Sequence, residues 1–263
     1  MPVHNAGPYL DASIESVLTQ TFTDFELVVL DDRSTDGSAG QLRDWAKRDP
    51  RIRLVESPVR LGLPRGSDRV VRESRAAVCA RMDADDVSCP ARLAAQWEAL
   101  KANPDATLVG TLWEGIDGRG RLVRPRDRWR LTRRSSFAPF PHGSIMFRRE
   151  AFEAVGGYRV ACDYWEDLDL YLRMATRGRI LVVPEALYRY RFHSASRLGG
   201  PIEPDEERAA ELMLRCLAVR RAGGDYTPLA EQAPAGTERP FRLSPATLYH
   251  LAARRIWAGH RPG

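Results

Sequence analysis

The sequence is organised around one acidic segment, Ala80-Arg81-Met82-Asp83-Ala84-Asp85-Asp86-Val87. An apolar run, 76–80, leads directly into three carboxylates within four positions, and Ser88-Cys89-Pro90 then opens a helix. Carboxylates this close repel one another, so a divalent cation is the usual means of neutralising them at the end of a strand. Asp83 and Asp85, two positions apart, are the pair that could reach one ion. The alternative is a solvated acidic loop, which is what most acidic runs form.

The composition indicates a soluble globular chain with an excess of positive charge. Its 263 residues suffice for one large α/β domain or two small ones, and 43% hydrophobic with 29% charged residues is an ordinary mix. The net charge of +5 comes from arginine, since Lys47 and Lys101 are the only lysines, and it suits an anionic substrate or membrane surface. The cysteines show no CxxC spacing, so the sequence suggests neither a zinc site nor a disulfide framework. No run of ~18 apolar residues and no signal pattern occur, so we expect a cytoplasmic protein.

The first part of the chain alternates strands with helices. Apolar spacing predicts a helix over 9–20, a buried strand over 25–30, a helix through Leu42 and Trp45, and a strand over 52–55. This order is typical of a parallel sheet covered by helices, which binds ligands at the carboxyl ends of its strands. Both acidic loops, 31–32 and 83–86, follow strands, so we expect them to share one site.

A second acidic segment, Glu166-Asp167-Leu168-Asp169, begins a helix in the later part of the chain. Asp169 has Arg173 four positions on, and we expect an exposed pair there. Asp167 has no cation at that spacing. A carboxylate in a first helical turn is favoured by the helix dipole, so a structural role is the alternative to a catalytic one. Strands are predicted over 107–116, 180–183 and 187–192.

Five motifs in order resemble family 2 glycosyltransferases of the GT-A fold. They are Pro2-Val3-His4-Asn5, Leu18-Thr19-Gln20-Thr21-Phe22, Val29-Leu30-Asp31-Asp32-Arg33-Ser34-Thr35-Asp36, Arg81-Met82-Asp83-Ala84-Asp85-Asp86, and Glu166-Asp167 with the downstream Tyr190-Arg191-Phe192-His193. The resemblance implies a mixed, mostly parallel central sheet with helices on both faces. It also implies a nucleotide-sugar donor, usually linked to UDP, a divalent metal (Mn²⁺ or Mg²⁺) and inversion at the anomeric carbon.

The resemblance also implies a role for each donor-binding residue. Asp31 matches the carboxylate that binds the uracil or ribose, while Pro2, Val3 and Asn5 match the lip of the nucleotide pocket. Asp83 would contact the ribose.

The remaining implied roles concern the metal and the chemistry. Asp85 would ligate the metal on the diphosphate, and His193 matches a position beside that metal. Asp167 matches the general base that takes the proton of the acceptor hydroxyl, with Glu166 beside it on the donor. For His193, a structural place at a strand end is the alternative.

The first strand departs from the family pattern, because family members carry several strand residues before the Pro-Val-His-Asn motif. We therefore expect a truncated first strand and a natural protein that extends further at its N-terminus. A catalytically weak nucleotide-sugar-binding relic is accordingly the alternative function. A nucleotidyltransferase is a more distant one, since Glu166-Asp167 would have no role in it.

We expect a catalytic domain over 1–200 and a helical extension over 201–263. In that extension, helices are predicted over 204–222 and 244–257, with a linker near 223–240. An arginine-rich stretch, 119–134, is either a solvated loop or a contact surface for an anionic acceptor. The expected acceptor is a glycan, a lipid-linked glycan or a small molecule, with peripheral contact at the inner membrane face through helix 244–257 as an option. No nucleic acid partner is expected.

Overall fold

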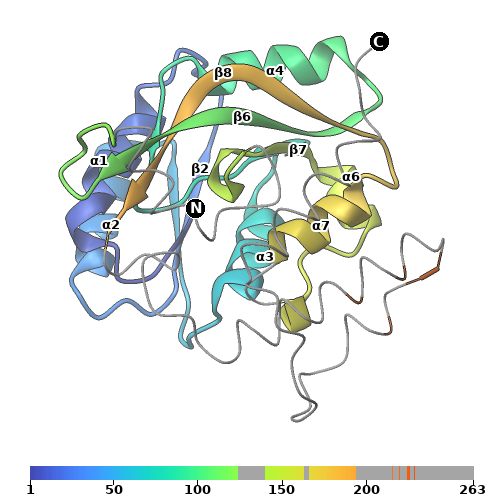
Figure 1. The fold of residues 1–263 in the computed structure, drawn as a ribbon. Coiled ribbons are helices and arrows are strands. Elements are labelled where there is room, and N and C mark those ends of the chain that lie inside the picture. Colours follow the sequence, from blue (N-terminus) through green and yellow to red (C-terminus); the bar gives the residue numbers. More distant parts are fainter. Residues whose placement is uncertain are drawn as a thin grey trace, which may run out of the picture.

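The computed structural model describes residues 1–123, 140–162 and 166–193, with a few single residues between 215 and 228. The predicted helices over 204–222 and 244–257, the linker 223–240 and most of the arginine-rich stretch therefore lie outside the described residues, isolated positions excepted. Figure 1 shows the described part as two sheets with helices packed around them. Among these residues, no helix is long and apolar enough to cross a membrane.

The first half of the chain builds a parallel three-stranded sheet in the order β1-β2-β3. Its strands and covering helices are β1 (Pro2–Val3), α1 (Gly7–Leu18), β2 (Leu27–Asp31), α2 (Ser38–Arg48), β3 (Ile52–Glu56) and α3 (Leu63–Glu73). All five residues of β2 are buried, in keeping with the apolar run over its first four positions before Asp31. Pro8 lies in the first turn of α1, where its missing N–H costs nothing. The predicted alternation is confirmed.

The second sheet has five strands in the order β4-β7-β6-β8-β5. Its elements are β4 (Val78–Ala80), β5 (Val87–Ser88), α4 (Arg92–Ala102), β6 (Ala106–Asp117), η1 (His142–Ser144), β7 (Met146–Arg148), α6 (Arg149–Ala154), η2 (Val160–Cys162), α7 (Glu166–Met174) and β8 (Arg179–Phe192). The pair β6–β8 is parallel, and the other three pairings are antiparallel. In Figure 1 β6 and β8 run side by side as the two longest strands, with α4 along them.

Three apolar clusters hold the layers together. One joins α1 to β2, a second joins β7 to α6 and α7, and a third lies under α4. The α/β class with helices around a mixed sheet is confirmed.

Two sequence expectations need correction in detail. The strands predicted over 180–183 and 187–192 form one continuous strand, β8, with irregular register near the centre of its pairing with β6. The pair formed by Asp169 and Arg173 is buried rather than exposed, with 0% and 7% of the side chains accessible. Arg159 also lies 3.5 Å from Asp169. Asp169 is therefore part of the interior, where α7 packs on its neighbours.

Candidate active site

The acidic loop between β4 and β5 places its carboxylates in different environments. Asp86 is 1% exposed, and it accepts hydrogen bonds from the Tyr188 hydroxyl at 2.8 Å and the Arg191 N–H at 2.7 Å. Burial, followed by the charges of Asp85 and Asp83, raises the pKa of Asp86 well above its usual value. Asp86 is thus a buried structural residue, and both of its hydrogen-bond donors belong to β8.

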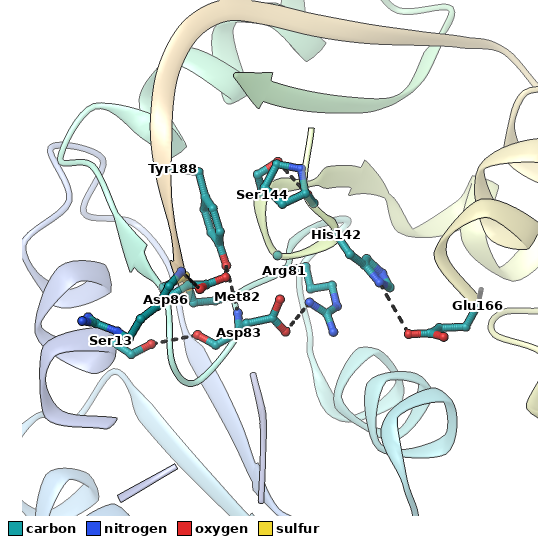
Figure 2. A network of polar contacts seen from close by, with 12 residues as sticks. Ser13, Arg81, Met82, Asp83, Asp86, His142, Ser144, Glu166 and Tyr188 are labelled. Atoms are coloured by element: carbon teal, nitrogen blue, oxygen red, sulfur yellow. Dashed lines mark hydrogen bonds and ion pairs between the residues drawn. The ribbon is translucent and has the colours of Figure 1, made fainter. Parts of the chain in front are cut away.

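Asp83 and Asp85 lie at the open side of the loop. Asp83 forms an ion pair with Arg81, and its carbonyl accepts a hydrogen bond from the Ser13 hydroxyl at 2.9 Å, as Figure 2 shows. The Asp85 carboxylate lies 2.9 Å from His193 Nε2. About a third of the Asp85 side chain is accessible. The fold therefore brings Asp85 and His193 together from distant parts of the chain.

The position of His193 follows from the pairing of β8 with β5. These strands are antiparallel, with Val87 beside Arg189, so the end of β8 returns over the acidic loop. There Arg191 Nε donates a hydrogen bond to the Asp85 carbonyl at 2.6 Å. The Arg191 guanidinium carbon lies 4.9 Å from the centre of the Tyr9 ring, and the centres of the Tyr9 and His193 rings are 4.6 Å apart. These contacts fix both the main chain and the imidazole beside Asp85.

The ends of β1 and β2 form the second part of the site. Val3 pairs with Asp31 in the parallel ladder, so the two predicted pocket residues are neighbours. Asn5 has φ 55°, and its side-chain oxygen accepts the Thr35 N–H at 2.8 Å. The Asp31 carboxylate accepts the Ser34 N–H at 3.2 Å. The two loops are thus tied together at the carboxyl edge of the sheet.

Two neighbours of this pair behave differently. Pro2 faces away from the edge, toward α3, where a Cβ on Gly66 would lie 3.6 Å from the Cβ of Pro2. Asp32 is 2% exposed, pairs with Arg60 and accepts the N–H groups of Leu61 and Gly62. Asp32 therefore closes the loop before α3. Asp31 is also buried, at 6% exposed, and of this group only Asn5 is exposed at the edge.

The first turn of α7 meets the acidic loop around one buried phenol, Tyr158. Burial raises the pKa of Tyr158; Arg81 opposes this rise, whereas Glu166, Asp167 and Asp83 add to it. Carboxylates from two segments that are distant in the sequence therefore act electrostatically on one side chain. Asp167 is partly exposed, and its Oδ1 accepts the N–H of Leu168 at 2.7 Å.

His142 connects Tyr158 to Glu166. Its Nε2 lies 2.7 Å from the Tyr158 hydroxyl, and its Nδ1 lies 4.0 Å from the nearest Glu166 oxygen. Figure 2 shows Arg81 and Asp83 on one side of this group and Glu166 on the other. Arg81 is itself buried; burial opposes its charge, but Asp83 and then Tyr158 and Tyr188 outweigh burial and raise its pKa.

Several residues of this site carry no role in the sequence interpretation. Arg81 lies inside the acidic motif, so its position there was a usable signal. His142, Tyr158 and Tyr188 occupy no pattern that distinguishes them from core aromatics or loop residues. Only the fold brings them to the acidic loop.

The donor atoms for a metal are few. Among the described residues, no group of three or more His, Cys, Asp or Glu side chains gathers as a metal site. Asp85 with His193 supplies one carboxylate and one imidazole at an accessible edge. A Mg²⁺ or Mn²⁺ ion that completes its shell with substrate phosphates and water needs only one or two protein ligands. The pair therefore fits such an ion.

Comparison with known proteins decides the family. The family model described as glycosyl transferase family 2 matches residues 1–159. The chain belongs to this family. This glycosyltransferase is 32% identical to EpsE from Bacillus subtilis, a protein named as a putative glycosyltransferase. The alignment covers 88% of this chain and 85% of EpsE. It is 30% identical to WbnJ from Escherichia coli, an O-antigen biosynthesis glycosyltransferase. That alignment covers 74% of this chain and 79% of WbnJ.

Solved structures confirm the GT-A fold of this glycosyltransferase. S. aureus TarS 1-349 in complex with UDP-GlcNAc superposes with a TM-score of 0.66 at 14% identity, covering 87% of this chain and 67% of TarS. The mannosyltransferase PcManGT from Pyrobaculum calidifontis, in complex with GDP-Man and Mn²⁺, superposes with a TM-score of 0.62 at 22% identity. That match covers 100% of this chain and 74% of the mannosyltransferase. The predicted family, fold and enzyme class are confirmed.

Proposed function

We propose that this glycosyltransferase transfers a sugar from a UDP-sugar to an acceptor hydroxyl with inversion at the anomeric carbon. One observation carries the proposal: η1 lies between the two acidic segments, since a Cβ on Gly143 would lie 2.6 Å from the Asp83 carboxylate and His142 Nδ1 lies 4.0 Å from Glu166, the residue before Asp167. A donor diphosphate bound at the acidic loop would thus have a candidate base close to its sugar. Transfer needs both groups at one site, whereas nucleotide binding alone needs only the first.

The nucleoside is proposed to bind where β1 and β2 end. Asp31 would accept hydrogen bonds from the uracil or ribose. Val3 and Asn5 would border the base, and Pro2, which faces α3, would support them from behind. Asp83 would contact the ribose. The rigid ties between Asn5 and the loop after β2 support this assignment, because a fixed loop binds a base at low entropic cost.

Asp85 and His193 are proposed to hold the divalent ion, Mn²⁺ or Mg²⁺. Such an ion supplies charge neutralisation for the nucleoside diphosphate as it leaves. The chain's own contribution is orientation, because Arg191 binds the Asp85 carbonyl and Tyr9 packs against His193. Both ligands are thereby held beside the pocket.

Asp167 is proposed as the general base. The acceptor oxygen forms a bond to C1 of the sugar from the face opposite the diphosphate, its proton passes to Asp167, and the C1–O bond to the diphosphate breaks. A positioned base of this kind contributes roughly 10²–10⁴-fold to the rate. Glu166, which lies near His142, would bind hydroxyls of the donor sugar.

The acceptor is proposed to be a glycan, free or lipid-linked, at the inner face of the membrane. WbnJ is named as an O-antigen biosynthesis enzyme, which supports a glycan acceptor. The net charge of +5 suits an anionic acceptor or lipid surface.

The test measures UDP release from a panel of UDP-sugars, with GDP-sugars for comparison, in Mn²⁺ or with a chelator. We expect slow, metal-dependent release from one donor, loss of release in Asp85→Ala, and normal behaviour in Asp44→Asn, an exposed aspartate paired with Lys47. Asp167→Asn should bind the donor normally and lose at least 10²-fold in transfer to an acceptor. Donor binding without release or transfer in the unmutated protein would instead indicate a nucleotide-sugar-binding relic.

A further inference from the structure

One buried arginine has no role in the chemistry proposed above. Arg92, in the first turn of α4, is 1% exposed and is the largest of the fully buried side chains in the described part of the chain. Its hydrogen-bond partners there are two main-chain carbonyls, a hydroxyl and a thioether, and none of them is a carboxylate. Buried charges are normally paired with an opposite charge, so the contacts of Arg92 have to account for its presence.

These contacts connect the acidic loop to η1. Nη1 of Arg92 donates to the carbonyl of Arg81, the first residue of the acidic loop, at 3.0 Å. The same nitrogen donates to the carbonyl of Gly143 in η1 at 3.2 Å. Nε donates to the hydroxyl of Ser88, just after the acidic loop, at 2.7 Å. Both ends of the acidic loop and η1 are therefore bonded to one side chain.

α4 holds η1 at a second point, one turn further on. Gln96 is 0% exposed, and its Nε2 donates to the carbonyls of Ser144 at 2.7 Å and Val109 at 2.9 Å. The last two carbonyls of η1, those of Gly143 and Ser144, are thus both bonded to side chains of α4. A 3₁₀ segment of three residues has few hydrogen bonds of its own, so α4 determines where η1 lies.

The place of η1 matters because it touches both acidic segments. A Cβ on Gly143 would lie 2.6 Å from the Asp83 carboxylate, so this turn packs directly on the acidic loop. Figure 2 shows His142 pointing from the same turn toward Glu166, the neighbour of the proposed base, with Nδ1 4.0 Å from its carboxylate. A shift of η1 relative to the acidic loop would therefore change the separation of the two acidic segments.

We infer, taking the proposed function as given, that Arg92 is a positioning residue whose guanidinium sets the distance between the donor-binding acidic loop and the segment that carries the base. Arg92 contacts neither substrate nor metal in this role. Burial lowers its pKa to about 10, and Asp83 and Asp86 are among the groups that oppose this drop. Arg92 therefore remains a cation at neutral pH, and its charge partly offsets that of the acidic loop.

Lysine at this position would keep the charge and lose the geometry. A guanidinium is a planar fork with donors on three nitrogens, whereas lysine has one ammonium at the end of a flexible stem. Arg148 offers a matched control for Arg92→Lys. Its Nε donates to the Ala106 carbonyl at 2.9 Å and its Nη2 to the Leu100 carbonyl at 2.8 Å, near the other end of α4. It joins two main-chain segments in the same way, and its partners belong to neither acidic segment.

The first readout is amide hydrogen exchange in the full chain, without any ligand. The Arg81 N–H donates to the Ile145 carbonyl at 2.8 Å, and the Ser144 N–H donates to the Pro141 carbonyl at 3.0 Å, so these two amides report on the junction of the acidic loop with η1. The Leu30 amide in β2 is the internal reference for global unfolding. Relative to Leu30, we expect exchange at Arg81 and Ser144 to rise at least tenfold in Arg92→Lys and to stay unchanged in Arg148→Lys.

The second readout is UDP release from the panel of UDP-sugars in Mn²⁺, at a temperature at which circular dichroism shows each variant to be folded. A displacement of about 1 Å can lower a rate about 10²-fold, and we expect a fall of this size in the kcat of Arg92→Lys. The KM for the donor should change less than about threefold, because the partners of Arg92 lie outside the nucleoside-binding ends of β1 and β2. Arg148→Lys should keep both values. Arg92→Gln, which buries no charge, gives the same two readouts if the lysine variant does not fold.

Two results would overturn the assignment of Arg92. If the Arg81 and Ser144 amides exchange no faster in Arg92→Lys than in Arg148→Lys, the guanidinium does not hold the two segments together. If their exchange rises while kcat keeps its unmutated value, Arg92 contributes to stability alone. Absence of UDP release from every donor by the unmutated chain would instead be a failure of the proposed function, on which the exchange readout does not depend.

Discussion

The buried α-amino group of Met1 makes the stability of this chain depend on pH in a defined direction. Met1 is 4% exposed, and burial, together with the charge of Arg81, lowers the pKa of its amine from 8.0 to about 5. In the unfolded chain the amine keeps its ordinary pKa. Between these two values the unfolded state therefore binds a proton that the folded state does not.

The sign and the size of the effect follow from this difference. The stability that the neutral Met1 amine contributes is fully present above the unfolded pKa of 8.0. It is lost as the pH falls toward the folded pKa of about 5. Since one pKa unit corresponds to about 1.36 kcal/mol, the complete loss is about 4 kcal/mol. Between about pH 8.5 and about pH 6 the expected loss is about 2.5 kcal/mol.

The assay is urea unfolding at these two pH values, followed by tryptophan fluorescence. The control is the same chain acetylated at the Met1 amine, a small group for the cavity of about 340 Å³ that Met1 helps to line. Intact mass verifies that Met1 and the acetyl group are present. His4, whose pKa is lowered mainly by burial, titrates in both chains and cancels in the comparison.

The acetylated chain should lose about 2.5 kcal/mol less than the free chain over this interval. If both chains lose the same stability, the α-amino group does not titrate with a lowered pKa. Burial would then not lower the pKa of the Met1 amine.

Three substitutions test the interior of the site. Asp86→Ala should cost about 2 kcal/mol, because the Tyr188 hydroxyl loses its acceptor, while Asp86→Asn should cost less in the same urea titration. Asp169→Asn should lower the free energy of unfolding by about 3 kcal/mol, because it removes the charge of one partner of the buried pair with Arg173. A loss under about 1 kcal/mol, typical of an exposed pair, would contradict this. Gly143→Ala should weaken donor binding in calorimetry, since its Cβ would overlap the Tyr188 hydroxyl and lie 2.6 Å from the Asp83 carboxylate. Gly40→Ala, with open space around it, should not.

Much of the fold could be predicted because its signals are local. The helix expected over 9–20 is α1, Gly7–Leu18, and the strand expected over 25–30 is β2, Leu27–Asp31. Apolar spacing and turn residues determine such elements within a few positions. The position of η1 between the two acidic segments was not predictable in this way. It depends on Tyr158 and Arg81, whose burial is set by strands far away in the sequence.

The Asp169–Arg173 pair shows a related limit. The spacing of four correctly indicated an ion pair, yet it carries no information on burial. Whether that helix face is covered depends on Arg159 and Val155. Spacing therefore predicts partners within one element, and only packing between elements decides what a pair contributes to stability.

The role of Asp86 shows why three neighbouring carboxylates can coexist in one loop. Its carboxylate accepts from Tyr188, and the Tyr188 oxygen in turn accepts the Asp83 N–H at 3.4 Å. Asp86 also accepts the Arg191 N–H, and the Arg191 side chain binds the Asp85 carbonyl. The buried carboxylate is thus connected to the main chain of both exposed ones. Because hydrogen bonds from β8 satisfy Asp86 in the interior, only Asp83 and Asp85 remain at the accessible edge, where the proposed donor and metal would bind.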